Sequence, residues 1–118
     1  MENKIRSLTK RADFENLRAS GLSIHVNSWL LVNTQKTKSG EMRLGWTISR
    51  YTGSAVVRNR LRRWGREYLR KWRKTNDLSL DLNVIFKRKE KGFFKALTHE
   101  ELDGALEKLV AKVARAVR

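Results

Sequence analysis

The stretch from Gly53 to Lys74, GSAVVRNRLRRWGREYLRKWRK, constrains the fold most, because its charges and aromatic rings recur with helical spacing. From Ala55 onward it contains nine basic residues and one acid, Glu67. At about 100° per residue, one stripe of a helix would carry the larger apolar and aromatic side chains: Val57, Leu61, Trp64, Tyr68 and Trp72. Roughly opposite fall Arg58, Arg62, Arg66, Arg70 and Arg73, with Asn59 and Arg63 beside them. The pattern predicts a helix that buries one face and presents the other to a polyanion.

The overall charge of the chain agrees with a polyanionic partner. The 118 residues include 27 Lys and Arg against 12 Asp and Glu, a formal net charge of +15. Self-repulsion of this size destabilises a compact chain and favours association with an anion. General solubility, or contact with an anionic membrane surface, would also suit a basic chain. Because the charge is clustered and interleaved with aromatic rings, we interpret nucleic acid as the partner.

Residue types that usually carry chemistry are absent or scattered. The chain has no cysteine, which excludes disulfides, thiolate catalysis and Cys-based zinc sites. His25 and His99 lack metal-ligand spacing, and no nucleophile–base set is visible. We therefore predict a binding protein with no catalytic residue and no metal site of its own. The N-terminus lacks an apolar signal segment, and no run approaches the roughly 20 apolar residues of a membrane span, so we expect a cytoplasmic location.

Shorter segments around the long helix predict one α+β domain over residues 1–118. Residues 1–8 are interpreted as a mobile basic arm. Thr9 is expected to cap a helix over 10–20 that stops at Gly21. Strand patterns occupy 22–26, 29–34, 42–50 and 81–87, and 36–41 is predicted to be a hairpin loop that makes the third of these antiparallel to the second. A capping box at 98–101 predicts a final helix.

The long helix is expected to run from Ala55 to Arg73, with Ser54 as its N-cap. Gly65 lies inside it, where glycine costs about 1 kcal/mol relative to alanine, so we expect close packing against a neighbour there. A face made almost entirely of arginine favours contact with the nucleic-acid backbone over base reading. Phe14, Trp29 and Trp46 are candidates for stacking on bases, although core packing is expected for at least two of the three.

The residues from Gly53 to Arg66 resemble the signature of the bacterial ribonuclease P protein subunit, G-x-A-V-x-R-N-R-x-[KR]-R-x-x-R. The flanks are similar too. Leu8 to Phe14 resembles the basic opening of that family, which ends in Asp-Phe. The range 43–50, RLGWTISR, resembles its strand R-[VL]-G-x-x-V-S-[KR], and 84–89 resembles a later strand ending in Ala-Arg-Lys. The likeness covers roughly residues 5 to 115.

The resemblance implies a small mixed sheet packed with helices, similar to domain 2 of ribosomal protein S5 and containing a left-handed βαβ crossover. It implies that the chain assists a catalytic RNA in removing the 5′ leader of precursor tRNA. The expected partners are that RNA and the leader, with no membrane and no small-molecule substrate. The Mg²⁺ cofactor is expected to be held by the RNA, which also contains the catalytic centre.

Site residues follow from the resemblance by position. The residues expected to face the catalytic RNA are Arg58, Asn59, Arg60, Arg62, Arg63 and Arg66, together with Arg50, Arg88 and Lys89. Phe14 matches an aromatic residue of a leader cleft between the sheet and the first helix. A second cleft aromatic of the family is replaced by Arg18 and a strand tyrosine by Val32, so Trp29 and Trp46 are candidates to supply stacking instead. Many relatives have Lys-Lys at Arg50-Tyr51, and often Asn at Ser54.

Two other functions remain open at this point. One is an RNA-scaffold or ribosomal protein with no role in catalysis, which would bind ribosomal RNA and leave tRNA processing untouched. The other is a membrane-surface or calmodulin-like partner that uses the amphipathic helix over 55–74. The second requires the apolar stripe of that helix to be accessible, whereas we expect it to be buried against the sheet.

Overall fold

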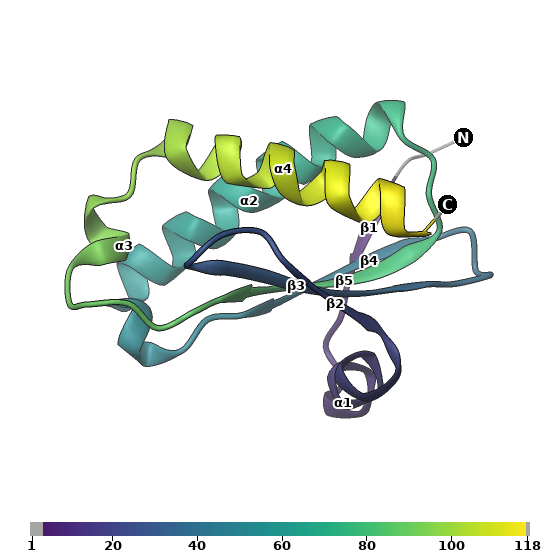
Figure 1. Ribbon diagram of the computed structural model, residues 1–118, viewed down its shortest axis with the longest axis horizontal. Helices are drawn as coiled ribbons and strands as arrows, with labels where there is room; N and C mark the ends of the chain where they lie inside the picture. Colours follow the sequence, from purple (N-terminus) through teal and green to yellow (C-terminus); the bar gives the residue numbers. More distant parts are fainter. Residues whose placement is uncertain (1–3, 118) are drawn as a thin grey trace.

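A computed structural model describes residues 4–117 and shows a five-stranded sheet with helices on both faces (Figure 1). The strand order is β1-β4-β5-β3-β2, and the pairs β1–β4 and β4–β5 are parallel while β5–β3 and β3–β2 are antiparallel. The elements are β1 (Ile5–Ser7), α1 (Arg11–Ser20), β2 (Leu22–His25), β3 (Leu30–Lys36), β4 (Met42–Thr47), the 3₁₀ turn η1 (Arg50–Thr52), α2 (Ala55–Thr75), β5 (Leu80–Phe86), α3 (Phe93–Ala96) and α4 (His99–Val117). The predicted α+β class with a small mixed sheet is confirmed.

The two faces of the sheet differ in polarity. Successive side chains of a strand point to opposite faces, so Leu80, Leu82, Val84 and Phe86 of β5 face one side and form the core with α2 and α4. The other side carries mostly polar groups, including Arg43, Asn33 and Asn83, and is crossed by α1. Figure 1 shows α2 and α4 on one side of the sheet and α1 alone on the other. The apolar face holds the fold together, while the polar face beneath α1 stays available.

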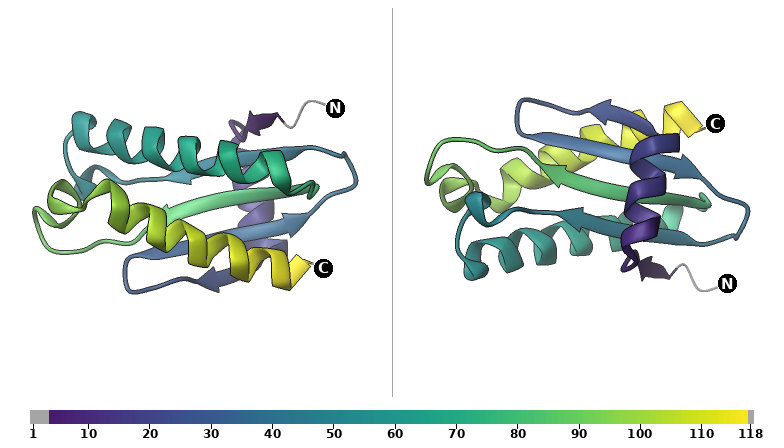
Figure 2. Two further views of the ribbon diagram at one scale, coloured as in Figure 1. Left: turned by 90° about the horizontal axis from the view of Figure 1, so that it is seen from above. Right: turned by 90° about the horizontal axis from the view of Figure 1, so that it is seen from below.

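The predicted hairpin between the second and third strand segments is wrong. β3 and β4 do run in opposite directions, but β5 lies between them and pairs with both. β5 is buried on nearly its whole length, which suits a central strand. The left view of Figure 2 shows the sheet with α2 in front of it. When this view is turned so that β4 and β5 point up, β5 lies to the left of β4. The β4-α2-β5 crossover is therefore left-handed, as predicted, and is an exception to the usual right-handed rule.

The N-terminal segment also differs from its prediction as a mobile arm. Ile5 to Ser7 form β1, which pairs in parallel with Met42 to Leu44, and Leu8 is buried. The Leu8 N–H donates to the Leu44 carbonyl at 2.9 Å, so an exposed edge of β4 orders this segment. Residues 1–3 of the predicted arm lie outside the described residues. Thr9 is not the cap of α1, because Lys10 occupies that position without a side-chain bond, whereas Gly21 ends the helix as predicted.

The long helix begins where it was predicted and extends two residues further, to Thr75. The Ser54 Oγ accepts the Val57 N–H at 3.3 Å, which confirms the cap. Its buried positions are Val57, Leu61, Gly65, Leu69 and Arg73, whereas Trp64, Tyr68 and Trp72 are half-buried along one flank. Arg73 was predicted on the solvent face and is instead buried. The capping box of α4 is confirmed by reciprocal bonds between Thr98 and Glu101 at 3.0 and 3.1 Å.

Candidate nucleic-acid interface

The outer surface of α2 presents a cationic strip. Asn59, Arg63 and Arg66 are exposed, and Arg62 is half-exposed. The Arg62 guanidinium donates to the Asn59 side-chain oxygen at 2.8 Å, which holds these two side chains together on one turn. Beneath them, Val57 and Leu61 of the apolar stripe are buried, and Trp64, Tyr68 and Trp72 are half-buried, so the helix has no open apolar face. The requirement for an accessible apolar stripe, on which a membrane-surface or calmodulin-like role depended, is not met.

Arg60 and Arg58 differ from the rest of the strip. The Arg60 guanidinium donates to the Phe94 and Lys95 carbonyls at 3.1 and 3.0 Å and lies 4.8 Å from the Trp64 ring centroid. It therefore ties α2 to the end of α3. Arg58 is half-buried, and its Nε is covered by protein without a hydrogen-bond partner among the described residues. Of the residues predicted on this helix, Asn59, Arg62, Arg63 and Arg66 are the ones most available to a partner.

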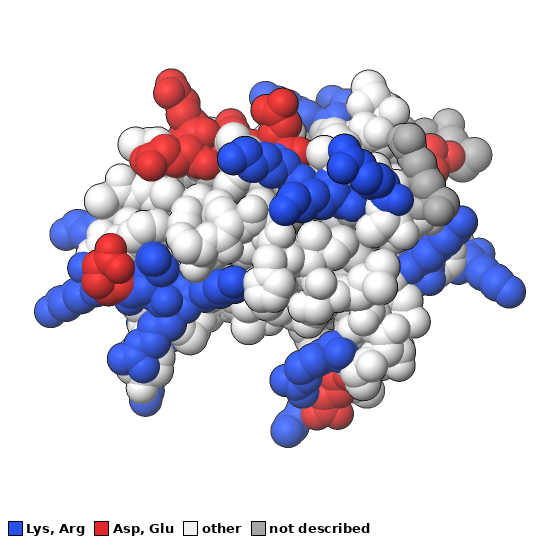
Figure 3. Space-filling model, in the orientation of Figure 1, with Lys and Arg blue, Asp and Glu red and all other residues white. Residues whose placement is uncertain are grey.

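A second group of cations lies at the end of the sheet where α2 begins. Because β4 and β5 are parallel, their carboxyl ends share one edge, and the segments that follow them meet there. Arg50, Arg88 and Lys89 come together around a cavity of about 330 Å³ whose other lining residues are Tyr51, Thr52, Gly53, Lys91 and Gly92. Figure 3 shows Lys and Arg gathered at the end of the molecule near α3. Tyr51 and Lys91 were not predicted as site residues, and their only sequence signal is their place beside predicted cations.

A third feature is a cavity of about 490 Å³ between α1 and the polar face of the sheet. Phe14 lines it from α1, and its ring lies directly on the backbone of Gly45. A Cβ built at Gly45 would lie 2.6 Å from a Phe14 ring carbon, so only glycine admits the ring at this depth. The remaining lining residues are Arg11, Glu15, Arg18, Asn33, Thr47, Asn83 and Ile85. The cavity combines one aromatic ring, two guanidinium groups, one carboxylate, which is paired with Arg11 at 2.9 Å, one aliphatic side chain and neutral hydrogen-bonding groups.

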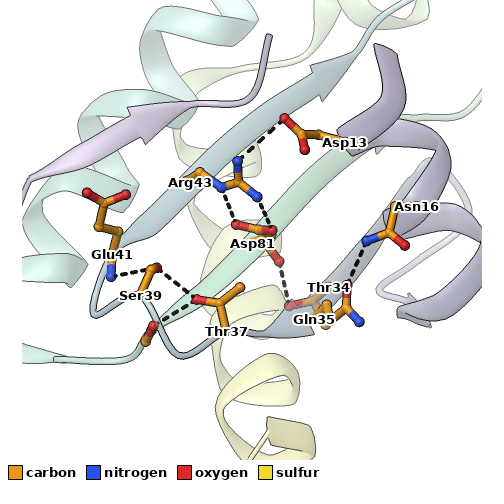
Figure 4. A network of polar contacts seen from close by, with 10 residues as sticks. Asp13, Asn16, Thr34, Gln35, Thr37, Ser39, Glu41, Arg43 and Asp81 are labelled. Carbon is orange, nitrogen blue, oxygen red and sulfur yellow. Dashed lines mark hydrogen bonds and ion pairs between the residues drawn. The ribbon is translucent and has the colours of Figure 1, made fainter. Parts of the chain in front are cut away.

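An ion-pair network positions α1 over the sheet (Figure 4). Arg43 forms a two-pronged contact with Asp81 on the neighbouring strand, with both N–O distances 2.8 Å, and reaches Asp13 of α1 at 3.4 Å. The hydrogen bond from Arg43 to Asp81 raises the pKa of Arg43, partial burial opposes that shift, and the nearby carboxylates add to it. The network fixes the distance between the helix and the sheet, and thereby the width of the cavity.

The prediction that Trp29 and Trp46 contribute to the same cleft as Phe14 is wrong. Trp46 packs under α2, where a Cβ at Gly65 would lie 2.3 Å from its ring. Trp29 stacks on Phe86 with ring centroids 6.4 Å apart. Both rings therefore lie on the apolar face, opposite Phe14. Trp46 does so because its position in β4 alternates with Gly45 and Thr47, which face α1, whereas Trp29 precedes β3 and turns onto Phe86 and Phe94. The expected close packing of Gly65 is confirmed in the same contact.

Within residues 4–117, no group of three or more His, Asp or Glu side chains is placed to hold a metal ion. Over the same range, no helix is both long and apolar enough to cross a bilayer. What the described surface offers is arginine on a rigid helix, a basic cavity beside it and an aromatic cavity on the opposite face. Forked guanidinium contacts and aromatic rings are the means by which proteins bind RNA. Fold and surface together define a small basic α+β protein of the RNA-binding class.

Comparison with known proteins makes the assignment specific. The model of the family described as Ribonuclease P matches residues 2–114. The ribonuclease P protein component of Desulforapulum autotrophicum is 33% identical over 112 residues, covering 95% of this chain and 92% of that protein. The corresponding protein of Desulfosudis oleivorans is 35% identical over 108 residues, covering 92% and 85%. The chain belongs to the ribonuclease P protein family.

Solved structures agree with the sequence comparison. The ribonuclease P protein of Staphylococcus aureus superposes with a TM-score of 0.78 at 30% identity, covering 98% of this chain and 100% of the other. The protein from Thermotoga maritima gives 0.78 at 28% identity, covering 91% and 96%. As a ribonuclease P protein component, the chain is an RNA-binding protein of tRNA processing.

Proposed function

We propose that this chain binds the catalytic RNA of ribonuclease P and the 5′ leader of precursor tRNA, and thereby assists removal of the leader. The observation that carries the proposal is the exposed Asn59–Arg66 strip of α2 beside the basic cavity, in a chain of this family. The catalytic centre and its Mg²⁺ ions lie in the RNA, and no step of the chemistry is assigned to a protein side chain. The chain would then bind precursor tRNA in the cytoplasm, which is its proposed location.

The strip on α2 and the basic cavity are the proposed contacts to the catalytic RNA. Arg62, Arg63 and Arg66 supply forked donors to phosphate oxygens, and Asn59 supplies a neutral donor and acceptor beside them. Arg50, Arg88 and Lys89 extend the same surface past the start of α2. Arg58 stands at the inner margin of the strip. Arg60 acts chiefly by holding α3 in place, since its guanidinium is already bonded to two carbonyls.

The cavity under α1 is the proposed site of the leader. A single strand has unstacked bases, and Phe14 offers one of them a ring on which to stack. Arg18 lies on the same helix, where it can pair with a neighbouring phosphate. Arg11 is bonded to Glu15 at 2.9 Å and would exchange that partner for a phosphate. Asn33, Asn83 and Thr47 line the floor, and the Thr47 hydroxyl already donates to the Asn83 oxygen at 3.0 Å. A strand bound here would leave the α2 strip free for the catalytic RNA.

Cleavage of precursor tRNA tests the proposal directly. The full chain is added to a bacterial ribonuclease P RNA at a Mg²⁺ concentration at which the RNA alone is nearly inactive. We expect the protein to restore cleavage at the mature 5′ end. Failure with several bacterial RNAs of this type, combined with co-purification of ribosomal RNA, would instead indicate a scaffold protein.

The salt dependence of binding tests the α2 strip. A variant with Arg63→Ala and Arg66→Ala should bind the catalytic RNA less tightly. The slope of log K against log salt should flatten by roughly 0.7–0.9 for each phosphate that no longer pairs with an arginine. The matched control, Lys36→Ala with Lys38→Ala, removes the same charge from the end of β3 and the loop that follows it, and should change the slope less. Equal slopes for the two variants would mean that total charge, and not this surface, governs binding.

A further inference from the structure

Tyr51 is an aromatic ring held in solvent by an ordered turn. Tyr51 is 57% exposed, whereas its neighbour Thr52 is 5% exposed. The turn is closed by the Thr52 N–H, which donates to the Ser49 carbonyl at 3.0 Å, and by the Gly53 N–H, which donates to the Arg50 carbonyl at 3.3 Å. An exposed tyrosine on a fixed backbone loses little entropy when a flat partner stacks on it. The ring is not needed for the core.

Cations surround this ring. The Arg88 guanidinium carbon lies 4.4 Å from the centroid of Tyr51, and that of Arg50 lies 5.5 Å from it. Lys89 and Lys91 complete the set, and among the described residues no Asp or Glu lines the cavity. Four positive charges around one small cavity repel one another, so an anion that binds there relieves this repulsion.

Two further features of the cavity favour an anion that can also form hydrogen bonds: the N-terminus of α2 and the hydroxyl group of Thr52. Gly53 leads directly into the first turn of α2, a helix of 21 residues whose N-terminal dipole favours negative charge. The Oγ1 of Thr52 is buried without a hydrogen-bond partner in the part of the chain that the structure describes, and Thr52 lines the cavity. The site therefore has features of a phosphate site next to an exposed aromatic face.

We propose that this cavity is a subsite for one unpaired nucleotide, whose base stacks on Tyr51 and whose phosphates are held by Arg50, Arg88 and the two lysines. The proposal deepens the proposed function and rests on it in one respect, namely that the nucleotide belongs to an RNA bound by this chain. The nucleotide must be unpaired because base faces within a duplex are already stacked. This subsite is distinct from the leader cavity, which lies under α1 and is lined by none of these residues.

The experiment uses the full chain and a ten-nucleotide single-stranded RNA of uridines with one central 2-aminopurine, which cannot pair with itself and whose fluorescence falls when the 2-aminopurine stacks. Tyr51→Ala should bind about tenfold more weakly and quench less, because one stacked base is worth roughly this factor. Tyr51→Phe should behave like the wild type. The salt slope should be the same for all three proteins, because stacking releases no counterions. Thermal melting confirms that each variant is folded.

A duplex of the same length is the matched control. The wild type and Tyr51→Ala should bind it equally, and equal weakening on the duplex and the single strand would overturn the proposal. So would unchanged single-strand binding by Tyr51→Ala, a loss with Tyr51→Phe, or a flattened salt slope that showed Tyr51 merely positioning the arginines. The oligonucleotide assay is independent of cleavage. If the wild type gives no stacking signal but still restores cleavage, only this subsite is rejected. If the wild type stacks the probe as expected but does not restore cleavage, the ribonuclease P role is rejected.

Discussion

Arg73 shows how one side chain can leave the face that its spacing assigns to it. It stands among the arginines of α2, yet its side chain is only 3% exposed. The guanidinium donates to the backbone carbonyls of Asn76 at 3.3 Å, Gly40 at 3.4 Å and Leu78. It also forms an ion pair with the Asp77 carboxylate at 3.7 Å. These carbonyls belong to the segments that enter β4 and β5. Arg73 is therefore a structural residue that joins the end of α2 to two loops.

Replacement of Arg73 by methionine should lower the free energy of unfolding by about 2–3 kcal/mol. The methionine fills similar space but leaves three partly buried carbonyls without their donor, and a fully buried group of this kind costs about 1–3 kcal/mol. Denaturant unfolding measures the effect. Arg70→Met, at an exposed position one turn earlier, should stay within about 0.5 kcal/mol of the wild type. Similar losses of unfolding free energy for the two variants would show that the contacts of Arg73 do not stabilise the fold more than those of an exposed arginine.

Tyr68 carries the expected dependence of stability on alkaline pH. Burial raises the pKa of its phenol, and the negative charges of Glu107 and Asp103 on α4 add to the shift. In the unfolded chain the phenol ionises near its ordinary pKa of about 10, whereas in the fold it keeps its proton to higher pH. Its contribution is therefore complete below that value and is lost as the pH rises above it.

Tyr68→Phe should lose less stability than the wild type between roughly pH 9 and 11. The comparison of the two proteins across the same pH series removes the effect of every group other than Tyr68. Chemical unfolding at each pH measures the difference. If the two curves ran parallel through this range, the shift of the Tyr68 pKa would have no energetic consequence.

At the scale of elements, the packing of α2 on β4 depends on a missing side chain. The ring of Trp46 lies against the backbone of Gly65, and it also stacks on Phe86 with centroids 6.3 Å apart. The ring is thus held from two sides and has little room to move. Gly104 on α4 offers a contrast, since a Cβ there would meet nothing within 4 Å among the described residues.

Alanine at these two helical glycines should have opposite effects. Gly104→Ala should stabilise the protein by about 0.5–1 kcal/mol, because alanine is the better helix former. Gly65→Ala gains the same propensity but overpacks the Trp46 ring, which costs roughly 1–3 kcal/mol, so a net loss is expected. Thermal and denaturant unfolding of both variants decide the matter. Stabilisation by Gly65→Ala would show that α2 can shift freely on the sheet.

The order of the strands was the part of the element pattern that local signals misassigned. Ser39-Gly40 between two β-prone segments favours a hairpin, and Gly40 does have a positive φ of 77°. The loop instead turns the chain far enough for β5 to enter between β3 and β4. The signal for this lay in the apolar residues Leu80, Leu82, Val84 and Phe86, which need an interior position, but strand pairing over such sequence distances is not visible in local spacing.

At the scale of the whole molecule, the net charge of +15 shapes both stability and binding. The cations lie on several surfaces: the outer side of α2, the cavity near α3, and the stretches of α4 and α1 visible in Figure 3. Acidic side chains gather at the start of α4 and compensate only locally. Repulsion among these cations therefore destabilises the free protein, and screening by salt or binding of RNA reduces that repulsion.

The melting temperature should rise when NaCl is increased from about 20 to 200 mM, because the Debye length shortens from about 20 Å to below 10 Å. A relief of about 1 kcal/mol corresponds to roughly 4 °C for a domain of this size. Scanning calorimetry at constant pH measures the shift. The same osmotic strength supplied by a neutral solute controls for excluded-solute effects. A melting temperature that fell with salt would mean that attractive ion pairs outweigh the repulsion.

Spacing and composition were enough to predict four features: the family motif, the two-faced long helix with its Ser54 cap, the capping box of the last helix and the basic character of the surface. Each depends on spacing along one element or on composition, which tertiary contacts do not change. Only the tertiary structure decided that Arg73 is buried, that Trp29 and Trp46 lie opposite Phe14, and that Tyr51 meets Arg88. The contacts of Arg73 and Tyr51 depend on the parallel pairing of β4 with β5, which brings together segments that lie far apart in the sequence.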